Sequence, residues 1–424
     1  MGDMLNKGNK FLSPVLGHYT ELEVESAKGI KVYTTDGREY IDFSSGVAVA
    51  NTGHCHPQVV QAITDQAKKL IHISAGVAYC APNVDLAQKL VQITDVLEGS
   101  VYFAQSGTEA IEASLKLAKY VSGKKKIVAY TGAFHGRTLA SLSVTYKDKF
   151  KKGYEEWIIE DIVRIKYPYC FRCPYGASYG KCKFECVSDM KQTILNDTDV
   201  AAVIIEPIMG EGGYIPAPVQ YIQELRRFTL ENNIFLIFDE IQTGFGRTGT
   251  MFAKEHYDVT PDIYALAKGI ASGLPLSACV AKKEIMDKWT KSAHGGTFLG
   301  NPICCAAALA TIDVIDNEKL LENAYNVGQY IKNALKELQG NFPVIGDVRG
   351  FGLMIGIEFV YPENNLPNPD LVLRLRKKAL EKGLILISCG DNDQVIRLIP
   401  PLIISMDEAK NALDILVDCL KESL

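Results

Sequence analysis

The sequence predicts an α/β protein in which a large domain with a mostly parallel central sheet is joined to a smaller α+β domain. The first observation is an alternation of short apolar, β-rich runs with a segment of helical spacing, typical of a parallel sheet covered on both faces. The second is a change of pattern near Asn301, where a long helix gives way to short strands mixed with helices. The alternating runs occupy 126–130, 201–205 and 234–238, with the helical segment at 220–232.

The remaining elements follow from the same periodicities. Residues 31–50 predict short strands around a turn at Asp36-Gly37, and Val59 to Leu70 has helical spacing. Ser106 to Tyr120 begins with a helix-start signal, Ser-Gly-Thr-Glu. In the last third we expect a helix over 302–338, strands at 350–359, 384–388 and 395–399, and helices at 370–382 and 407–423.

These elements predict a division into three stretches of chain. Residues 1–55 would form the N-terminal part of the small domain, and 56–305 the large domain. Residues 306–424 would complete the small domain. The large domain carries an insertion at 167–186 that is rich in Cys, Pro, Gly and Tyr.

Composition restricts the classes of function. The chain of 424 residues is 47% hydrophobic and 22% charged, and its formal net charge is −5 with no basic block. Nucleic acid and anionic membrane are therefore not expected as partners. No apolar run approaches the roughly 20 residues that span a bilayer, and the first residues lack the apolar core of a signal peptide. We expect a cytoplasmic protein.

Lys268 and Asp239 carry the clearest chemical signal. Lys268 lies in an apolar stretch followed by glycines, and Asp239 ends the apolar run at 234–238. A lysine in apolar surroundings can lose its proton and attack a carbonyl. Together the two residues suggest pyridoxal 5'-phosphate (PLP), with the lysine holding the aldehyde as a Schiff base and the aspartate keeping the pyridine nitrogen protonated. The alternative is a surface lysine and a helix-capping aspartate.

Two further loops follow predicted strands, where ligands of open parallel sheets bind. Ser106, Gly107 and Thr108 follow the run at 101–104 and start a helix, so their amides could bind a phosphate or simply cap the helix. The second loop follows the run at 126–130. Its aromatic, imidazole and guanidinium groups could stack on a ring and receive a carboxylate, or lie on a plain surface; they belong to Phe134, His135 and Arg137.

Charges of opposite sign come from two distant segments. Glu206 and Glu211 follow the run at 201–205, where two carboxylates would repel each other without a nearby cation. Arg397 lies within the apolar run Val-Ile-Arg-Leu-Ile, where a buried unpaired charge would be costly. Its partner could be Glu211, a substrate carboxylate, or each in turn. The alternative is an outward-facing arginine on a half-exposed strand.

Taken together in this order, the motifs resemble those of the class III (ω-amino acid) PLP-dependent aminotransferases over nearly the whole chain. The tail, Gly383 to Gly390 followed by Arg397, is most similar to 4-aminobutyrate aminotransferases. The resemblance implies fold type I of the PLP-dependent transferases. The motifs are Ser106-Gly107-Thr108-Glu109-Ala110, Phe134-His135-Gly136-Arg137-Thr138, Glu206-Pro207 with Gly210-Glu211-Gly212-Gly213, Asp239-Glu240-Ile241-Gln242-Thr243-Gly244, Lys268, and Gly295-Gly296-Thr297-Phe298-Leu299-Gly300-Asn301-Pro302.

The resemblance also implies roles for individual residues. Lys268 would bind the cofactor and move the proton, and Asp239 would pair with the pyridine nitrogen. Arg137 would take the α-carboxylate of glutamate or 2-oxoglutarate. Arg397 would take the distal carboxylate, with Glu211 neutralising it for monocarboxylate substrates. The other expected cofactor contacts are Ser106, Gly107, Thr108, Phe134, His135, Gln242 near the ring oxygen, and Thr297 from a second subunit; Glu206 is expected beside the substrate.

The insertion contains one feature that the family pattern does not require. Cys170, Cys173, Cys182 and Cys186 have a spacing that suits a structural zinc ion or an iron–sulfur cluster. The alternatives are free thiols or two disulfides, and a cytosolic setting disfavours disulfides.

The functional prediction is transfer of an amino group from an ω-amino acid, 4-aminobutyrate, to 2-oxoglutarate, in a homodimer or tetramer. The alternatives are a PLP-dependent racemase or epimerase on the same scaffold, an ornithine or 5-aminovalerate aminotransferase, and a non-enzymatic protein that uses the cysteine segment to bind a metal or a partner.

Overall fold

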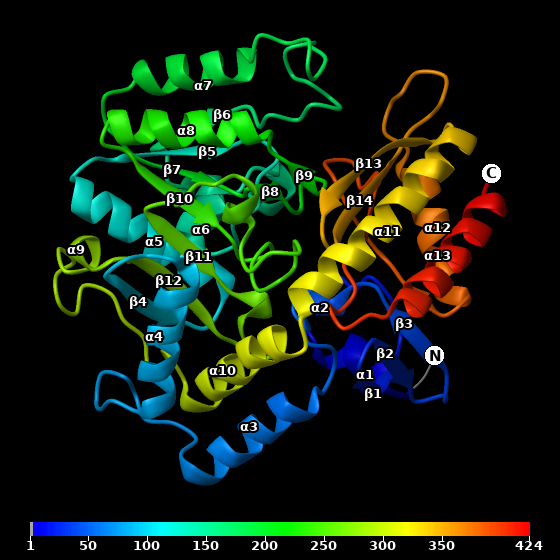
Figure 1. Ribbon diagram of the computed structural model, residues 1–424, viewed down its shortest axis with the longest axis horizontal. Helices are drawn as coiled ribbons and strands as arrows, with labels where there is room; N and C mark the ends of the chain where they lie inside the picture. Colours follow the sequence, from blue (N-terminus) through cyan, green and yellow to red (C-terminus); the bar gives the residue numbers. More distant parts are fainter. Residues whose placement is uncertain (1–2) are drawn as a thin grey trace.

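The computed structural model describes residues 3–424, which form a larger lobe built around a twisted sheet and a smaller lobe beside it (Figure 1). The described chain contains a seven-stranded sheet in which β12 runs antiparallel to both neighbours and the remaining pairs are parallel. In spatial order its strands are β4 (Gly99–Ala104), β12 (Ser277–Lys282), β11 (Ile263–Leu266), β10 (Phe235–Asp239), β7 (Val200–Ile205), β5 (Lys126–Tyr130) and β6 (Ile162–Ile165).

Helices cover both faces of this sheet (Figure 1). On one face, α7 (Glu185–Leu195) and α8 (Val219–Glu231) pack with Val203 and Ile205 of β7. On the other, α5 (Gly107–Ser122) packs with Ala202 and Ile204. Successive side chains of a strand point to opposite faces of the sheet. Because helices cover both faces, β7 is buried along its whole length. This double burial explains why its sequence is a continuous apolar run rather than an alternation.

The small lobe combines segments from both ends of the chain. One sheet consists of β1 (Val24–Lys28), β2 (Lys31–Thr34), β3 (Glu39–Asp42) and β15 (Leu384–Ile385), and β15 is parallel to β3. A second sheet is formed by β13 (Ile345–Phe351), β14 (Met354–Phe359), β17 (Val395–Leu398) and β16 (Ile387–Cys389). The N-terminal strands thus pair with the C-terminal part of the chain.

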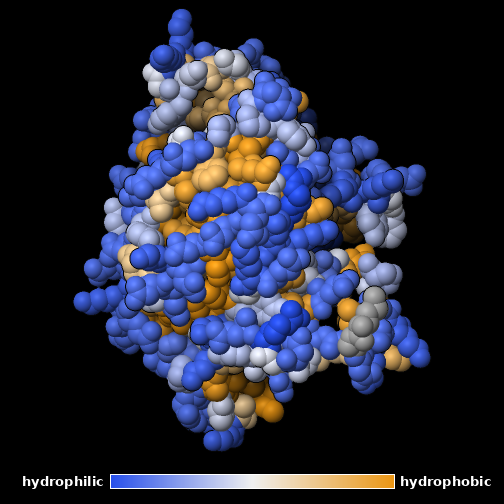
Figure 2. All heavy atoms as spheres, turned by 90° about the vertical axis from the view of Figure 1, so that its right-hand side faces the viewer, coloured by the Kyte–Doolittle hydropathy of each residue, from blue (hydrophilic) through white to orange (hydrophobic). Residues whose placement is uncertain are grey.

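The outer side of the small lobe is formed by helices α11 (Leu320–Asn341), α12 (Pro369–Glu381) and α13 (Met406–Lys421) (Figure 1). In α12, Leu371, Val372, Leu375 and Ala379 face the core. Hydrophilic side chains predominate on the side of the molecule that Figure 2 shows. These helices are therefore amphipathic, with one apolar face against the sheet.

The helix expected over 302–338 is two helices, so this prediction was wrong in detail. Helix α10 (Pro302–Asn317) packs against α3 (Pro57–Lys69) and α4 (Ala81–Thr94) of the large lobe, whereas α11 packs on β13 of the small lobe. The chain turns between them at Lys319, which has φ of +54°. The expected strand at 350–359 is likewise the paired strands β13 and β14. The division into domains at 55 and 305 stays a prediction, and the second boundary falls within α10.

The insertion at 167–186 is tied to the small lobe by a buried carboxylate. Glu358 of β14 is fully buried and accepts from Arg172 Nε at 2.5 Å, from Arg349 Nη2 at 2.7 Å and from the Tyr169 hydroxyl. Arg349 also donates to the Gly213 carbonyl at 2.7 Å. One carboxylate therefore connects the insertion, the small-lobe sheet and the loop that follows β7. Across residues 3–424, no helix combines the length and apolarity needed to cross a membrane.

We expect Glu358→Gln to destabilise the fold by roughly 3 kcal/mol, because it removes the counter-charge of Arg172 and leaves the buried Arg349 with Asp347 alone. Burial would raise the pKa of Glu358, but Arg349 and the hydrogen bonds from Tyr169 and Arg172 lower it overall. This stabilisation is present above the unfolded pKa, about 4.3, and is lost as pH falls through the folded pKa.

The check is the urea concentration at half-unfolding, measured between pH 7 and pH 3. The difference between Glu358→Gln and the parent protein should be largest at neutral pH and shrink in acid. The matched control is Glu363→Gln, which makes the same change at an exposed position. Equal effects of the two substitutions would contradict a structural role for the buried carboxylate.

Candidate active site

The site is a cavity of about 480 Å³ at the carboxyl ends of the parallel strands. The loop after β5 supplies Phe134 to Arg137, the loop after β7 supplies Glu206 and Glu211, β10 ends in Asp239, and Lys268 lies two residues beyond β11. Because these strands are parallel neighbours, residues far apart in sequence meet at one edge of the sheet. The wall includes the following sequence-predicted residues: Ser106, Gly107, Thr108, Phe134, His135, Arg137, Glu206, Glu211, Asp239, Gln242 and Lys268.

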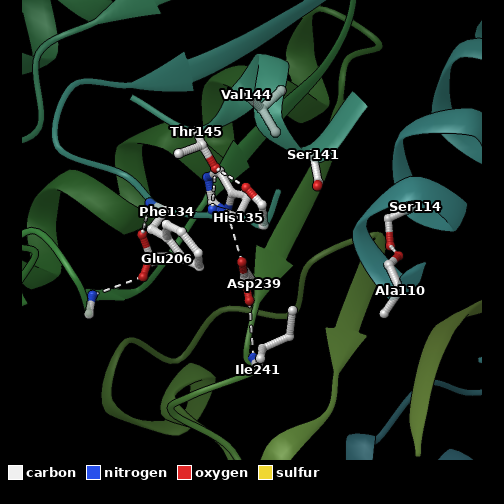
Figure 3. Close-up of polar contacts among 12 residues, drawn as sticks. Ala110, Ser114, Phe134, His135, Ser141, Val144, Thr145, Glu206, Asp239 and Ile241 are labelled. Atoms are coloured by element: carbon white, nitrogen blue, oxygen red, sulfur yellow. Dashed lines mark hydrogen bonds and ion pairs between the residues drawn. The ribbon is translucent and has the colours of Figure 1, made fainter. Parts of the chain in front are cut away.

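Asp239 is held from two sides (Figure 3). Its Oδ2 lies 2.7 Å from Nδ1 of the buried His135, and its Oδ1 accepts from the Ile241 amide at 3.1 Å. The His135 amide in turn donates to Thr145 Oγ1 at 2.9 Å. An ionised carboxylate can only accept, so the His135 ring must carry a proton on Nδ1. Asp239 is thereby a fixed negative charge at the base of the cavity.

Lys268 supplies a half-buried amine in the cavity wall. It follows β11, the parallel neighbour of β10, and its φ of +49° is in the left-handed region. Burial lowers the pKa of Lys268 to about 8, although Asp239 opposes the shift. A substantial fraction of the amine is therefore neutral near physiological pH, as attack on a carbonyl requires.

The first turn of α5 forms another part of the cavity wall. Ser106 is the N-cap: its hydroxyl accepts from the Glu109 amide, and the Glu109 carboxylate accepts from the Ser106 amide at 2.7 Å. The amides of Gly107 and Thr108 belong to the helical turn that has no intrahelical acceptor. A Cβ on Gly107 would lie 3.1 Å from the Ile241 side chain, so glycine keeps the backbone open here. This part of the cavity wall is suited to an anion.

An aromatic loop forms one side of the cavity. The Arg137 guanidinium lies over the rings of Phe134 and Phe150, 5.3 Å and 4.9 Å from their centroids. Glu206 accepts from the Phe134 amide at 2.9 Å and from the Gly210 amide at 2.8 Å (Figure 3). Burial raises the pKa of Glu206 to about 7. In this structure the Glu206 carboxylate thus supports the loop that presents Phe134 and Arg137.

Arg397 and Glu211 form the charged pair at the other side. Arg397 is 1% exposed, donates from Nη1 to Glu211 Oε2 at 3.1 Å, and donates from Nη2 to the Tyr19 hydroxyl at 2.9 Å. Within the described chain, its Nε has no hydrogen-bond partner. Glu211 is part of the cavity wall and Arg397 is not. The arrangement is a buried cation covered by a carboxylate that faces the cavity.

The sequence reasoning named neither Tyr19 nor Lys147. Tyr19 precedes β1 and reaches Arg397 across 378 residues of sequence. Lys147 lies 3.8 Å from Glu211 Oε1. Tyr19 belongs to no glycine-rich or charged motif. Lys147 begins a charged stretch, Lys147 to Lys152, which by its composition is typical of an exposed loop, so no local signal identified either residue. Thr297, by contrast, was predicted but is exposed and lies outside the wall of this cavity in the single chain.

The metal prediction for the insertion is not supported. Cys170, Cys173, Cys182 and Cys186 line one small pocket as free cysteines. Among residues 3–424, however, no group of three or more His, Cys, Asp or Glu side chains is arranged to hold a metal ion. Burial raises the pKa of both Cys170 and Cys186 to about 11. The described residues thus contain no preformed group of side chains that would hold zinc or an iron–sulfur cluster.

The chain is similar in sequence, over nearly its full length, to several known proteins. A 5-aminovalerate aminotransferase of Pseudomonas putida is 38% identical over 96% of this chain and 95% of its own. A 4-aminobutyrate aminotransferase of Escherichia coli is 35% identical, covering 99% and 98%. An alanine/serine racemase of Pyrococcus horikoshii is 36% identical, covering 100% and 90%.

The fold and the sequence pattern point to one family. A solved aminotransferase of Bacillus anthracis superposes with a TM-score of 0.92 at 29% identity, covering 99% of this chain and 98% of that one. The predicted α/β fold of type I is thereby confirmed. The sequence pattern of the class-III aminotransferases matches residues 14–420. As its ordered motifs predicted, the chain belongs to the class-III aminotransferases.

Proposed function

We propose that this enzyme transfers the amino group of 4-aminobutyrate to 2-oxoglutarate, giving the semialdehyde and glutamate. The observation that carries the proposal is the buried Arg397 covered by Glu211 at the cavity that also contains Lys268 and Arg137. Two arginines can receive the two carboxylates of a diacid, and a carboxylate that can move away from one of them allows a monoacid in the same place.

PLP is the cofactor that the cavity fits. Asp239 would face the pyridine nitrogen, the amides of Gly107 and Thr108 would receive the phosphate, and Lys268 would hold the aldehyde. When bound, the cofactor accepts the amino group and withdraws electrons from the substrate carbon. Gln242 Oε1, which has no hydrogen-bond partner in the described part of the chain, is a further polar atom at the wall.

Lys268 has two tasks in this proposal. Its neutral amine would hold the aldehyde of the cofactor, and as a free amine it would remove a proton from the substrate carbon and later release that proton. Burial suits both tasks, because it lowers the pKa of Lys268 to about 8. Asp239, oriented by His135, keeps its charge in place throughout.

The second candidate is a racemase on the same scaffold, favoured by the similarity to the alanine/serine racemase. A racemase returns the amino group to the carbon it left and needs no diacid acceptor. The buried pair of Arg397 and Glu211 has a clear purpose in transamination and none in racemisation, so we place transamination first. Ornithine and 5-aminovalerate are alternative donors, because no side chain in the cavity measures the length of the aliphatic chain.

We further propose a cytoplasmic homodimer that acts on small molecules only, with Thr297 reaching the phosphate of the neighbouring site. Support comes from large apolar side chains that are exposed on the isolated chain, in this segment and in the stretch after Leu70 that contacts it: Ile71, Val77, Tyr79 and Phe298. Exposed apolar side chains gathered in this way are typical of an interface.

A panel of amine donors with 2-oxoglutarate tests the function, with glutamate formation as the measurement. We expect 4-aminobutyrate to give the highest kcat/KM, ahead of 5-aminovalerate, ornithine and alanine. Each glutamate formed should match one donor consumed. Inversion of a chiral amino acid without any keto acid, and no glutamate from the panel, would establish the racemase instead.

We expect Lys268→Ala to lower turnover by more than about 10³-fold, because one amine both binds the cofactor and moves the proton. PLP should still bind, as seen by its absorbance after gel filtration, but borohydride should no longer attach it to the chain. Lys288→Ala, at an exposed position, is the control. Turnover within a few-fold of the parent would remove Lys268 from the reaction.

We expect Arg397→Ala to raise KM for 2-oxoglutarate by roughly 10- to 100-fold, the loss of one charge-assisted contact. Glu211→Gln should chiefly reduce kcat/KM for 4-aminobutyrate, because it leaves Arg397 uncompensated beside the aliphatic chain. The two half-reactions, followed separately by the cofactor absorbance, give these constants. Small and equal effects on both substrates would contradict the exchange of partners at Arg397.

A further inference from the structure

Glu211 lies between two cations rather than beside one. Its Oε2 accepts from Arg397 Nη1 at 3.1 Å, and its Oε1 is 3.8 Å from Lys147 Nζ. The Lys147 side chain is 9% exposed and that of Glu211 is 19% exposed. The Lys147 ammonium is therefore mostly removed from water and close to the carboxylate that covers Arg397.

Lys147 is held in place independently of the Glu211 side chain. Its Nζ donates to the Gly390 carbonyl at 2.7 Å, and the Gly390 amide donates to the backbone carbonyl of Glu211 at 3.0 Å. Gly390 has φ of +93°, and a Cβ there would lie 2.5 Å from the Gln394 side chain, so this turn requires glycine. The backbone of Glu211 is fixed by the same turn, which leaves its side chain as the movable part.

Lys147 provides a partner for Glu211 when a substrate carboxylate takes the place of Glu211 on Arg397. A diacid that places its distal carboxylate on Arg397 must displace Glu211, and a displaced, half-buried carboxylate without a partner is costly. It would also repel the incoming carboxylate. Lys147 lies on the opposite oxygen of Glu211, so a side-chain rotation away from Arg397 can bring the carboxylate onto the ammonium.

Arg397 is suited to this exchange. Glu211 separates its Nη1 from the cavity, so Nη1 becomes available to a substrate carboxylate when Glu211 turns away. The Tyr19 hydroxyl remains on Nη2 at 2.9 Å and can hold the guanidinium while Glu211 leaves. Asp391 is a further carboxyl group near Lys147. Burial raises the pKa of Asp391, although Lys147 opposes the shift.

We propose that Lys147 is a positioning residue that receives Glu211 when a dicarboxylate occupies Arg397, and so lets one cavity accept both a diacid and a monoacid. This inference rests on the proposed function, because it assumes that diacids bind at Arg397. Lys147 acts through Glu211 and does not itself contact the substrate. With a monoacid in the cavity, Glu211 stays on Arg397 and Lys147 has no part in binding.

Equilibrium binding of two inert acids to the PLP-loaded enzyme tests the proposal. Glutarate is the dicarboxylate probe and pentanoate the monocarboxylate probe, each measured by calorimetry. We expect Lys147→Met to weaken glutarate binding roughly tenfold, the effect of losing one charge-assisted contact, and to leave pentanoate binding within about twofold. Lys147→Arg should restore glutarate binding, because it keeps the positive charge.

The matched control is Lys149→Met, which removes the same charge two residues away at an exposed position. It should leave the affinities for glutarate and pentanoate unchanged. If it weakened glutarate binding as much as Lys147→Met does, the loss would come from the lower net charge of the protein, and the proposal would be wrong. Unchanged pentanoate binding in Lys147→Met shows that the variant is folded and loaded.

A double variant separates action through Glu211 from direct contact. In the Glu211→Gln background, Lys147→Met should weaken glutarate binding no further, and a loss as large as in the parent would overturn the proposal. Comparing the parent protein with Arg397→Ala separates a failure of the proposed function from a failure of the role of Lys147. If Arg397→Ala does not weaken glutarate binding, the proposed function fails. If it does but Lys147→Met has no effect, only the role of Lys147 fails.

Discussion

A positive charge buried inside the protein is the constraint on which the arrangement of this site depends. Arg397 lies in the middle of β17 with 1% of its surface exposed, and a guanidinium in that position must be neutralised. The partners come from distant parts of the chain, Glu211 from the loop after β7 and Tyr19 from the segment before β1. Meeting this requirement brings the N-terminal segment, the small-lobe sheet and the large lobe together at one point.

The same edge of the central sheet supplies the chemical groups. Asp239 ends β10, and Lys268 follows β11, its parallel neighbour, so a carboxylate and an amine are presented side by side. Burial lowers the pKa of Lys268. His135 and the Ile241 amide keep Asp239 in one orientation. The first turn of α5 adds an anion site to the wall of the same cavity.

The insertion at 167–186 contributes to the site indirectly. Arg172 and Tyr169 bind Glu358, which also binds Arg349, and Arg349 donates to the Gly213 carbonyl two residues from Glu211. The insertion thus supports the loop that covers Arg397. Its cysteines, which suggested a metal site by their spacing, are half-buried free thiols that line a small pocket, and burial raises the pKa of Cys170 and Cys186 to about 11.

The sequence by itself determined the features that depend on neighbours along the chain. The apolar runs at 126–130, 201–205 and 234–238 became parallel strands, the helix start at Ser106 became a capping box with Glu109, and Lys268 and Asp239 stood out from their surroundings. The ordered motifs added the family. These signals are local, because strand periodicity, capping and loop composition are set within a few residues.

Only the tertiary structure decided which distant groups meet. The contact of His135 with Asp239 joins residues 104 apart, and that of Lys147 with Gly390 joins residues 243 apart. The break at Lys319 arises where one apolar segment packs on the large lobe and the next on the small lobe, which periodicity alone cannot distinguish from one long helix. The cysteine spacing suggested a metal site, and the four cysteines do line one small pocket, but residues 3–424 contain no group of side chains arranged to hold a metal ion. Such pairings depend on how the strands and loops are brought together by packing, and no pattern of adjacent residues encodes them.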